Sequence, residues 1–266
     1  MTPSTPDIPE DDEPQSILAH LVELRQRLMW CCLILLTCFI AAFFFASHLY
    51  NCLAHPLAEI LLERQTDGGQ NPRMIFTSLT EPFFAHVKVA FFFALFVSTP
   101  VILTQIWLFI APGLYRKERK AVAPFLIASP LLFLLGAWLV WQLILPLAWR
   151  FFLQFENPGG AGTLPIELEA KVGEYLTLTM QLIFAFGLAF QLPVLMTLLV
   201  RAGILTADAL AERRRWAILG AFVFAAVFTP PDPVSQLSLA VPLVLLYEIS
   251  IRAARYIERR HSRNQT

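Results

Sequence analysis

The fold class of the chain is decided by the apolar stretch PFFAHVKVAFFFALFVSTPVILTQIWLFI, residues 82–110. Lys88 is its one charged residue. About 20 apolar residues are enough for a helix to cross the hydrocarbon core of a bilayer, so we predict a transmembrane helix here. Pro100 interrupts the stretch, and prolines inside bilayer helices usually mark a kink.

Outward from this stretch, five further apolar segments occur at residues 28–46, 121–146, 175–200, 216–228 and 234–250. The chain of 266 residues is 57% hydrophobic and 15% charged, whereas a soluble domain carries about 25% charged residues. We therefore predict an all-α integral membrane protein with six spans. At 1.5 Å per residue the last two segments cover only about 20 and about 25 Å, against ~30 Å of hydrocarbon, so both are expected to be short helices.

Basic residues are segregated along the chain. Most of the 20 Lys and Arg residues lie before the first segment, between the second and third, between the fourth and fifth, or after the sixth: Arg25, Arg27, Arg116, Lys117, Arg119, Lys120, Arg201, Arg213, Arg214, Arg215, Arg252, Arg255, Arg259, Arg260 and Arg263. Because cytoplasmic loops carry the excess of Lys and Arg, both termini are predicted to be cytoplasmic. We expect an acidic, disordered tail at 1–15, one membrane domain at 16–256 and a basic tail at 257–266.

Signatures of enzymes and of metal sites are missing from the sequence. It contains no HExxH, GxSxG or glycine-rich phosphate loop. The four cysteines, Cys31, Cys32, Cys38 and Cys52, form no CxxC pair and are interpreted as small buried side chains. The net charge of zero gives no indication of a nucleic-acid partner. We therefore predict a protein that is not an enzyme and that uses no cofactor.

Two short segments combine acids and bases near the ends of predicted spans. In SILAHLVELRQRL, residues 16–28, apolar residues share one helical face, and Glu23 and Arg27 are spaced to pair at i, i+4. This is either an interfacial helix with a local ion pair, or it holds the Glu23 carboxylate at the membrane surface for a cationic ligand. In APGLYRKERK, residues 111–120, Glu118 is the one acid among four bases, which by itself indicates a positive-inside anchor.

Five longer strings resemble one protein family. They are HLVELRQRL (20–28), FTSLTEPFFAHVKVAFF (76–92), STPVILTQIWLFIAPGLYRKER (98–119), FAFGLAFQLPV (184–194) and FTPPDPVSQ (228–236). In order and spacing they are similar to the TatC family, the six-span receptor subunit of the twin-arginine translocase. The resemblance extends from about residue 15 to about residue 256.

The resemblance implies a binding site for the consecutive arginines of a signal peptide. The two acids that match this role are Glu23 and Glu118, and Arg25 and Phe109 match accompanying positions. The chemistry is reasonable because two guanidinium groups each need a planar acceptor, and lysine cannot reproduce that fork. The basic residues around Glu118 would oppose a cationic ligand unless they contact lipid phosphate.

Other positions match parts of the family that lie away from this site. Pro56 matches the outer loop, and Asp232 and Gln236 match the short outer turn between spans five and six. Many relatives carry a glutamate where this chain has Gln191. Because glutamine does not titrate near neutral pH, Gln191 is expected to act as a membrane-embedded polar contact, either to a partner helix or between helices of the chain.

The resemblance implies a multi-pass protein of the bacterial cytoplasmic membrane that exports folded proteins using the proton motive force. Its expected partners are twin-arginine signal peptides, single-span proteins resembling TatA and TatB, further copies of itself and the lipid bilayer. A secondary transporter for small solutes is an alternative, but no inverted repeat of broken helices is evident. A passive scaffold is a third possibility, and it would not require Glu23 or Glu118.

Overall fold

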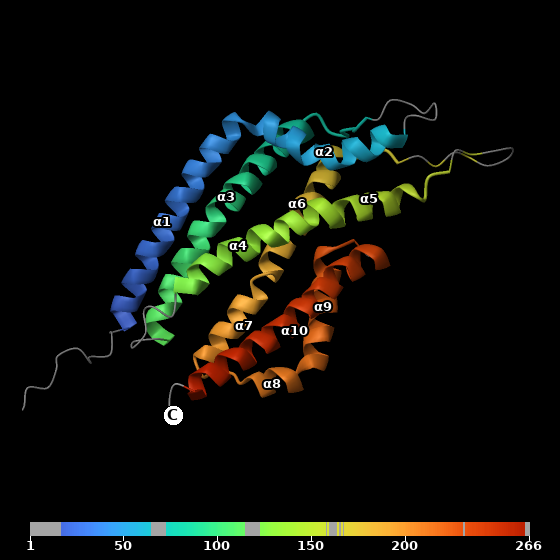
Figure 1. Ribbon diagram of the computed structural model, residues 1–266. Helices are drawn as coiled ribbons and strands as arrows, with labels where there is room; N and C mark the ends of the chain where they lie inside the picture. The colour runs from blue at the N-terminus through green and yellow to red at the C-terminus, as the bar shows by residue number, and fades with distance from the viewer. Residues whose placement is uncertain are drawn as a thin grey trace, which may run out of the picture.

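The computed structural model describes residues 17–64, 73–114, 123–157, 159, 164, 166, 168–230 and 232–263, and this part of the chain is almost entirely helical. Long helices run alternately between the two ends of an elongated bundle (Figure 1). The start of α1 (Ile17–Phe44) and the end of α10 (Pro233–Arg263) lie at the same end of it. An arrangement of this kind agrees with the predicted all-α membrane fold.

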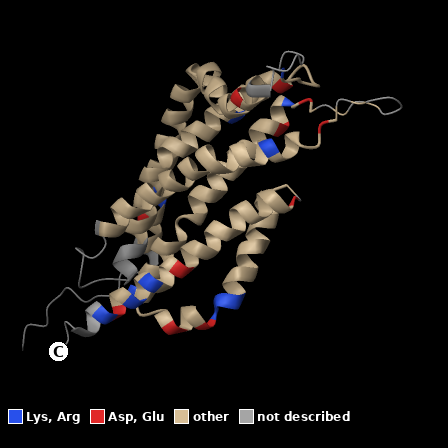
Figure 2. Cartoon of the chain, turned by 45° about the vertical axis from the view of Figure 1, so that its right-hand side comes forward, with Lys and Arg blue, Asp and Glu red and all other residues tan. Residues whose placement is uncertain are grey.

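Five helical stretches are long and apolar enough to span a membrane: His20–Phe44, Glu81–Phe109, Pro124–Leu153, Val172–Arg201 and Pro233–Arg259. They correspond to five of the six predicted spans. The remaining segment forms α9 (Arg214–Phe228), which has only 15 residues. The charged residues concentrate at the two ends of the bundle and leave a nearly uncharged middle (Figure 2), as expected of helices that cross a hydrocarbon layer.

Two helices differ from the expectations. The last helix is not short, because α10 has 31 residues and continues through the segment predicted as a basic tail. Arginine is a good helix former, so the basic sequence ends the apolar run without ending the helix. The segment after the first span contains α2 (Ala46–Arg64), whose Leu53, Leu57 and Ile60 are buried. This helix is stabilised by packing against the core, which its weak apolar pattern did not indicate.

The second predicted span is one continuous helix, α3 (Glu81–Leu114), although Pro100 lies inside it. The third and fourth spans are interrupted beside prolines. A π-helical turn, η4 (Val140–Ile144), joins α4 (Ala123–Leu139) to α5 (Leu145–Leu153), which has Pro146 in its first turn. The fourth span breaks at Phe190 and Gln191 between α6 (Val172–Ala189) and α7 (Leu192–Arg201), where Pro193 removes a backbone donor.

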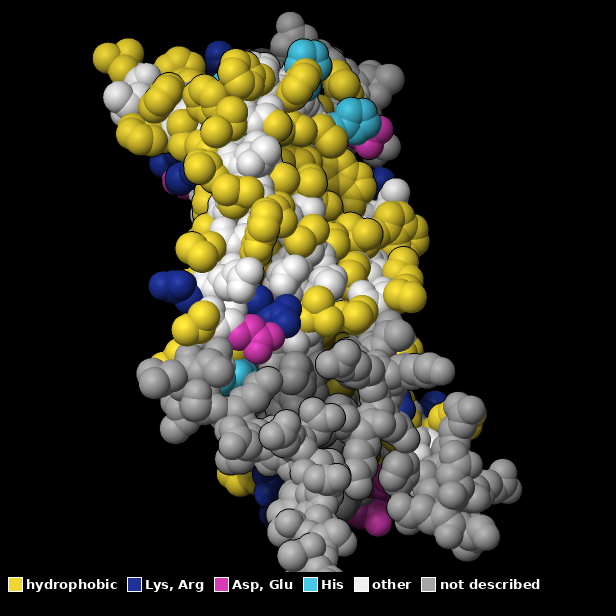
Figure 3. Space-filling view, turned by 90° about the vertical axis from the view of Figure 1, so that its left-hand side faces the viewer, with side chains coloured by type: hydrophobic (Ala, Val, Ile, Leu, Met, Phe, Trp, Pro, Cys, Tyr) yellow, Lys and Arg dark blue, Asp and Glu magenta, His cyan; other side chains and the backbone are white. Residues whose placement is uncertain are grey.

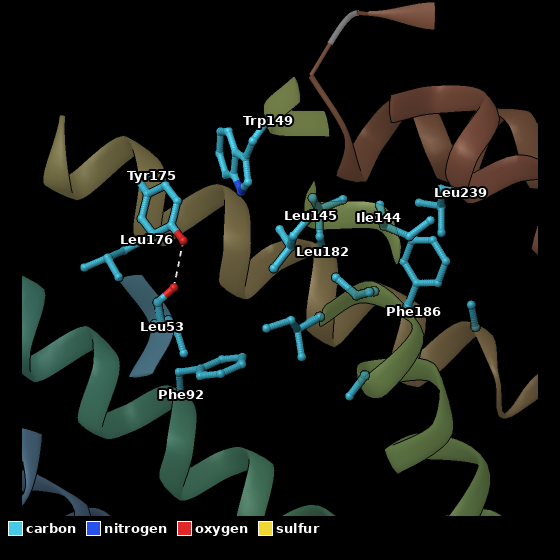
Figure 4. Packing of buried hydrophobic residues seen from close by; sticks show 14 of the residues in the cluster. Leu53, Phe92, Ile144, Leu145, Trp149, Tyr175, Leu176, Leu182, Phe186 and Leu239 are labelled. Carbon is cyan, nitrogen blue, oxygen red and sulfur yellow. Dashed lines mark hydrogen bonds between the residues drawn. The ribbon is translucent and has the colours of Figure 1, made fainter. Parts of the chain in front are cut away.

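The core lies where α4, α5 and α6 meet α2, α3 and α10 (Figure 4). Two glycines bring α4 and α6 close together. A Cβ on Gly187 would lie 2.4 Å from the ring of Phe133, and a Cβ on Gly136 would lie 2.7 Å from the carbonyl oxygen of Phe186. Small residues at such contacts let helix backbones approach in a membrane, where packing rather than the hydrophobic effect drives association.

Candidate functional site

A polar cluster joins α1 to α3 at the end of the bundle where the chain begins. Arg27 donates from Nε and Nη2 to Oε1 of Glu23, at 3.0 and 2.6 Å, and from Nη1 to Oε1 of Gln105 on α3, at 3.0 Å. The side chains of Glu23 and Arg27 are 31% and 23% exposed. The predicted i, i+4 pair is therefore confirmed, and it is also tied to a second helix. Seen from the side on which α1 lies, an acidic side chain is next to basic ones on a mostly apolar face (Figure 3).

An aromatic stack lies next to this cluster. The rings of His20 on α1 and Phe109 on α3 have centroids 4.3 Å apart and planes inclined by 18°. Since α1 packs mainly against α3, the stack and the hydrogen bonds fix the same pair of helix ends. Phe109 thus contacts α1 at His20, three residues before Glu23, and a shared role of Phe109 and Glu23 stays a prediction. Arg25 is exposed, about 200° around α1 from Glu23 in an ideal helix.

The second predicted acid, Glu118, lies outside the described residues, as does the rest of segment 115–122. The helix before this segment, α3, ends at Leu114, and the next, α4, begins at Ala123. The helix before this segment therefore carries Gln105 of the polar cluster and Phe109 of the aromatic stack. The convergence of the two acids stays a prediction.

Gln191 pairs with a residue of the same chain. Its side-chain Oε1 accepts a hydrogen bond from Oγ of Ser129 on α4, and its Nε2 donates to the Ser129 carbonyl at 2.9 Å. These bonds join α4 to the break between α6 and α7. The arrangement favours interhelical hydrogen bonding within the chain over a contact to a partner helix.

Pro56 does not lie in an open loop, as its predicted position implied, but is buried inside α2. Three residues before it, the carbonyl of Leu53 accepts a hydrogen bond of 2.7 Å from the hydroxyl of Tyr175 (Figure 4). Tyr50 stacks on His86 of α3 and donates to the sulfur of Met74 at 3.5 Å. Burial raises the pKa of the Tyr50 phenol, which keeps this donor protonated. Pro56 therefore belongs to the packing of α2.

Asp232 and Gln236 lie at the turn between α9 and α10, as predicted. Oδ1 of Asp232 accepts the backbone N–H of Ser235 at 2.7 Å and so caps α10, while Nε2 of Gln236 approaches the Phe222 carbonyl at 3.5 Å. Oδ2 of Asp232 and Oγ of Ser235 are buried without a hydrogen-bond partner. One carboxylate oxygen of Asp232 therefore caps α10, and the other accepts no hydrogen bond from the described residues.

Sequence reasoning missed a second acid at the far end of the bundle. Glu81, the first residue of α3, accepts backbone N–H groups from Thr77 at 2.8 Å and from Gly173 at 2.9 Å. Strand-like backbone pairing of Ile75 with Ala170 and Val172 lies beside it. The proximity of Glu81 to a glycine 92 residues away gives no signal in the sequence. Glu81 joins the starts of α3 and α6.

The features above define a class of protein: a polytopic helical membrane protein with a guanidinium-bound carboxylate at one end of its first helix and, among the described residues, no cluster of His, Cys, Asp and Glu fit for a metal. Comparison with known proteins gives the family. The Sec-independent protein translocase protein (TatC) family matches residues 19–242, and the chain belongs to it. This is a translocase component and not an enzyme family, which confirms the prediction that the chain is not an enzyme.

Several relatives cover nearly the whole chain. TatC of Magnetococcus marinus is 42% identical over 96% of this chain and 89% of its own length. TatC of Escherichia coli strain K12 is 36% identical over 92% of this chain and 90% of its own. The crystal structure of the twin-arginine translocase receptor TatC aligns with a TM-score of 0.75 at 36% identity, covering 90% of this chain and 99% of that one.

Proposed function

We propose that this protein is the signal-peptide receptor and core subunit of a twin-arginine translocase, which exports folded proteins across the cytoplasmic membrane with the proton motive force. The observation that carries the proposal is the carboxylate of Glu23, which already binds a guanidinium, is 31% exposed and lies three residues after His20, the residue that stacks on Phe109. Membership of the TatC family and the likeness to a solved translocase receptor support it.

In this proposal, Glu23 and Glu118 each receive one of two neighbouring arginines. Arg25, exposed on the opposite face of α1, interacts with the rest of the peptide or with lipid phosphate, and Phe109 provides an apolar surface stacked on His20. Charge-assisted hydrogen bonds contribute about 1.5–3 kcal/mol each. Loss of one such bond therefore corresponds to a roughly 10- to 100-fold loss of affinity.

We propose six spans with both termini in the cytoplasm of a bacterium and the chain in its inner membrane. The five long apolar helices and the common end shared by the start of α1 and the end of α10 support this (Figure 1). A sixth crossing requires α9, whose 15 residues measure about 22 Å. A short span is accommodated by local thinning of the bilayer. The membrane domain occupies residues 16–256, with an acidic tail before it and a basic extension after it.

The proposed partners are twin-arginine signal peptides, TatA- and TatB-like single-span proteins, further copies of the chain and lipid, with no nucleic acid. Membership of a translocase family supports assembly with other subunits. The surface of α1 suits a protein that works in an assembly or in lipid, because the rest of the chain does not bury the most apolar part of this helix. Gln191, Gln236, Asp232 and Pro56 are proposed to support this assembly by fixing helix ends and breaks.

The proposal is tested by measuring the affinity of a twin-arginine signal peptide for the full-length protein in lipid nanodiscs. The variants are Glu23→Gln and Glu118→Gln, with Glu174→Gln as a matched control, since Glu174 is an exposed acid at the other end of the bundle. Each site variant is expected to lose about 10- to 100-fold in affinity. Unchanged affinity in both would refute the receptor role.

A further inference from the structure

The guanidinium of Arg27 occupies the acid that the proposed receptor site would offer to a signal peptide. Two of its nitrogens contact the same oxygen of Glu23, at 3.0 and 2.6 Å, and the third contacts Gln105 at 3.0 Å. The chain therefore holds, at its own site, the same chemical group that a twin-arginine ligand would bring.

We propose that Arg27 is an internal competitor that lowers the affinity of Glu23 for a cationic ligand, and that Gln105 is the acceptor that keeps Arg27 after it is displaced. This inference rests on the proposed receptor function. It assigns roles to two residues that do not belong to the pair of acids.

The first step concerns charge. A positive group within 3 Å of a carboxylate cancels most of its attraction for a second cation, because the ion pair has almost no net charge. An incoming ligand thus meets a nearly neutral ion pair. Arg27 lowers the affinity of Glu23 for every cation, and only a group that replaces its contact well can bind.

The second step concerns shape. Arg27 approaches Glu23 with two donors of one planar fork. A ligand guanidinium reproduces this contact, so the exchange of one fork for another is close to balanced. A lysine ammonium is a strongly hydrated point charge without that fork and does not replace the lost contact in full. Displacing Arg27 costs the same for either ligand, so competition lowers both affinities by the same factor and the better fork of arginine keeps its advantage.

The third step concerns the displaced side chain. Gln105 belongs to α3, and its amide oxygen already accepts a hydrogen bond from Nη1 of Arg27. When Arg27 leaves Glu23, this acceptor remains available, so the guanidinium is not left without a partner beside the membrane. Gln105 thereby reduces the cost of displacement and is a positioning residue for Arg27.

The test measures affinities of two peptides, identical except for an Arg-Arg or a Lys-Lys pair, for the full-length protein in nanodiscs. Arg27→Gln is expected to tighten the binding of both peptides by about tenfold and to leave the Arg-Arg preference unchanged. Arg214→Gln is the matched control, because Arg214 also pairs with a glutamate, at 2.8 Å from Glu248, but lies on α9. The control is expected to leave both affinities unchanged.

Gln105→Leu gives a second, independent reading. It leaves Arg27 on Glu23 but removes the alternative acceptor, so Arg-Arg binding is expected to weaken severalfold while the preference persists. Unchanged or weaker binding of both peptides in Arg27→Gln overturns the inference and leaves Arg27 as a tie between helices. If the unaltered protein does not bind the Arg-Arg peptide, or if Glu23→Gln and Glu118→Gln both bind it equally well, the receptor proposal itself fails.

Discussion

The amide of Gln191 and the hydroxyl and carbonyl of Ser129 exchange two hydrogen bonds across the interface between α4 and the break that precedes α7. In this chain the position holds a neutral amide whose donor and one acceptor are used inside the protein. Gln191 thus connects the break between α6 and α7 to α4.

The replacement Gln191→Leu is expected to destabilise the protein by about 1 kcal/mol, since it removes both interhelical bonds. Thermal unfolding in detergent measures the change. Gln181→Leu is the control, because Gln181 is exposed on α6. We expect transport to fall only as far as the amount of folded protein falls. Transport lost at unaltered stability would instead indicate a contact beyond the chain.

Substitution of Gly187 by alanine is expected to destabilise the contact of α4 with α6 by about 1–3 kcal/mol. The added Cβ would meet the ring of Phe133, which is fully buried and has little room to move. Gly220→Ala on α9 is the control, as a Cβ there meets open space. It should be neutral or stabilise the helix by about 0.5–1 kcal/mol. Equal melting temperatures for the two variants would contradict the packing described here.

The starts of α3 and α6 are expected to separate more easily when Glu81 is replaced by glutamine. The two oxygens of the carboxylate each accept a backbone N–H group, whereas a glutamine amide has a single oxygen, which is also a weaker acceptor. A lower melting temperature and faster proteolysis between residues 154 and 171 are expected. Glu174→Gln, in an exposed pair with Lys171, serves as the control. If Glu81→Gln matches the control, the acid does not hold these ends together.

Topology is tested by labelling single cysteines placed in a variant that lacks the four native ones. Cysteines at Lys117, Gly203 and Arg255 are expected to react from the cytoplasm, and one at Pro230 from the opposite side. The pair at 203 and 230 flanks α8 (Ala207–Glu212) and α9, and so decides whether the short helix α9 crosses. Labelling of both from the same side would reduce the number of spans to four or five.

Much of the helical architecture could be predicted from local sequence. The apolar stretch at 82–110 became a single helix. The pairing of Glu23 with Arg27 followed from i, i+4 spacing. In each case the deciding interactions connect residues close in the chain, so their pattern is visible in the sequence.

The features that were missed depend on contacts between distant segments. Gln105 meets Arg27 from 78 residues away, and Glu81 meets Gly173 from 92 residues away. The helix α2 carries a proline and a weak apolar pattern, and it forms because its buried face meets Tyr175 and the rest of the core. The sequence predicts too short a last helix, because hydrophobicity falls after residue 250 whereas the helix continues to Arg263.

The central claim is that Glu23 and Glu118 contact the same short signal peptide. The most direct measurement is photo-crosslinking of a twin-arginine peptide, with a photoreactive group beside its arginines, to the full-length protein, followed by mapping of the crosslinked residues. We predict crosslinks to positions 18–28 and to positions 109–120, both lost when the peptide carries no arginine pair. Crosslinks to only one segment, or to neither, would contradict the account.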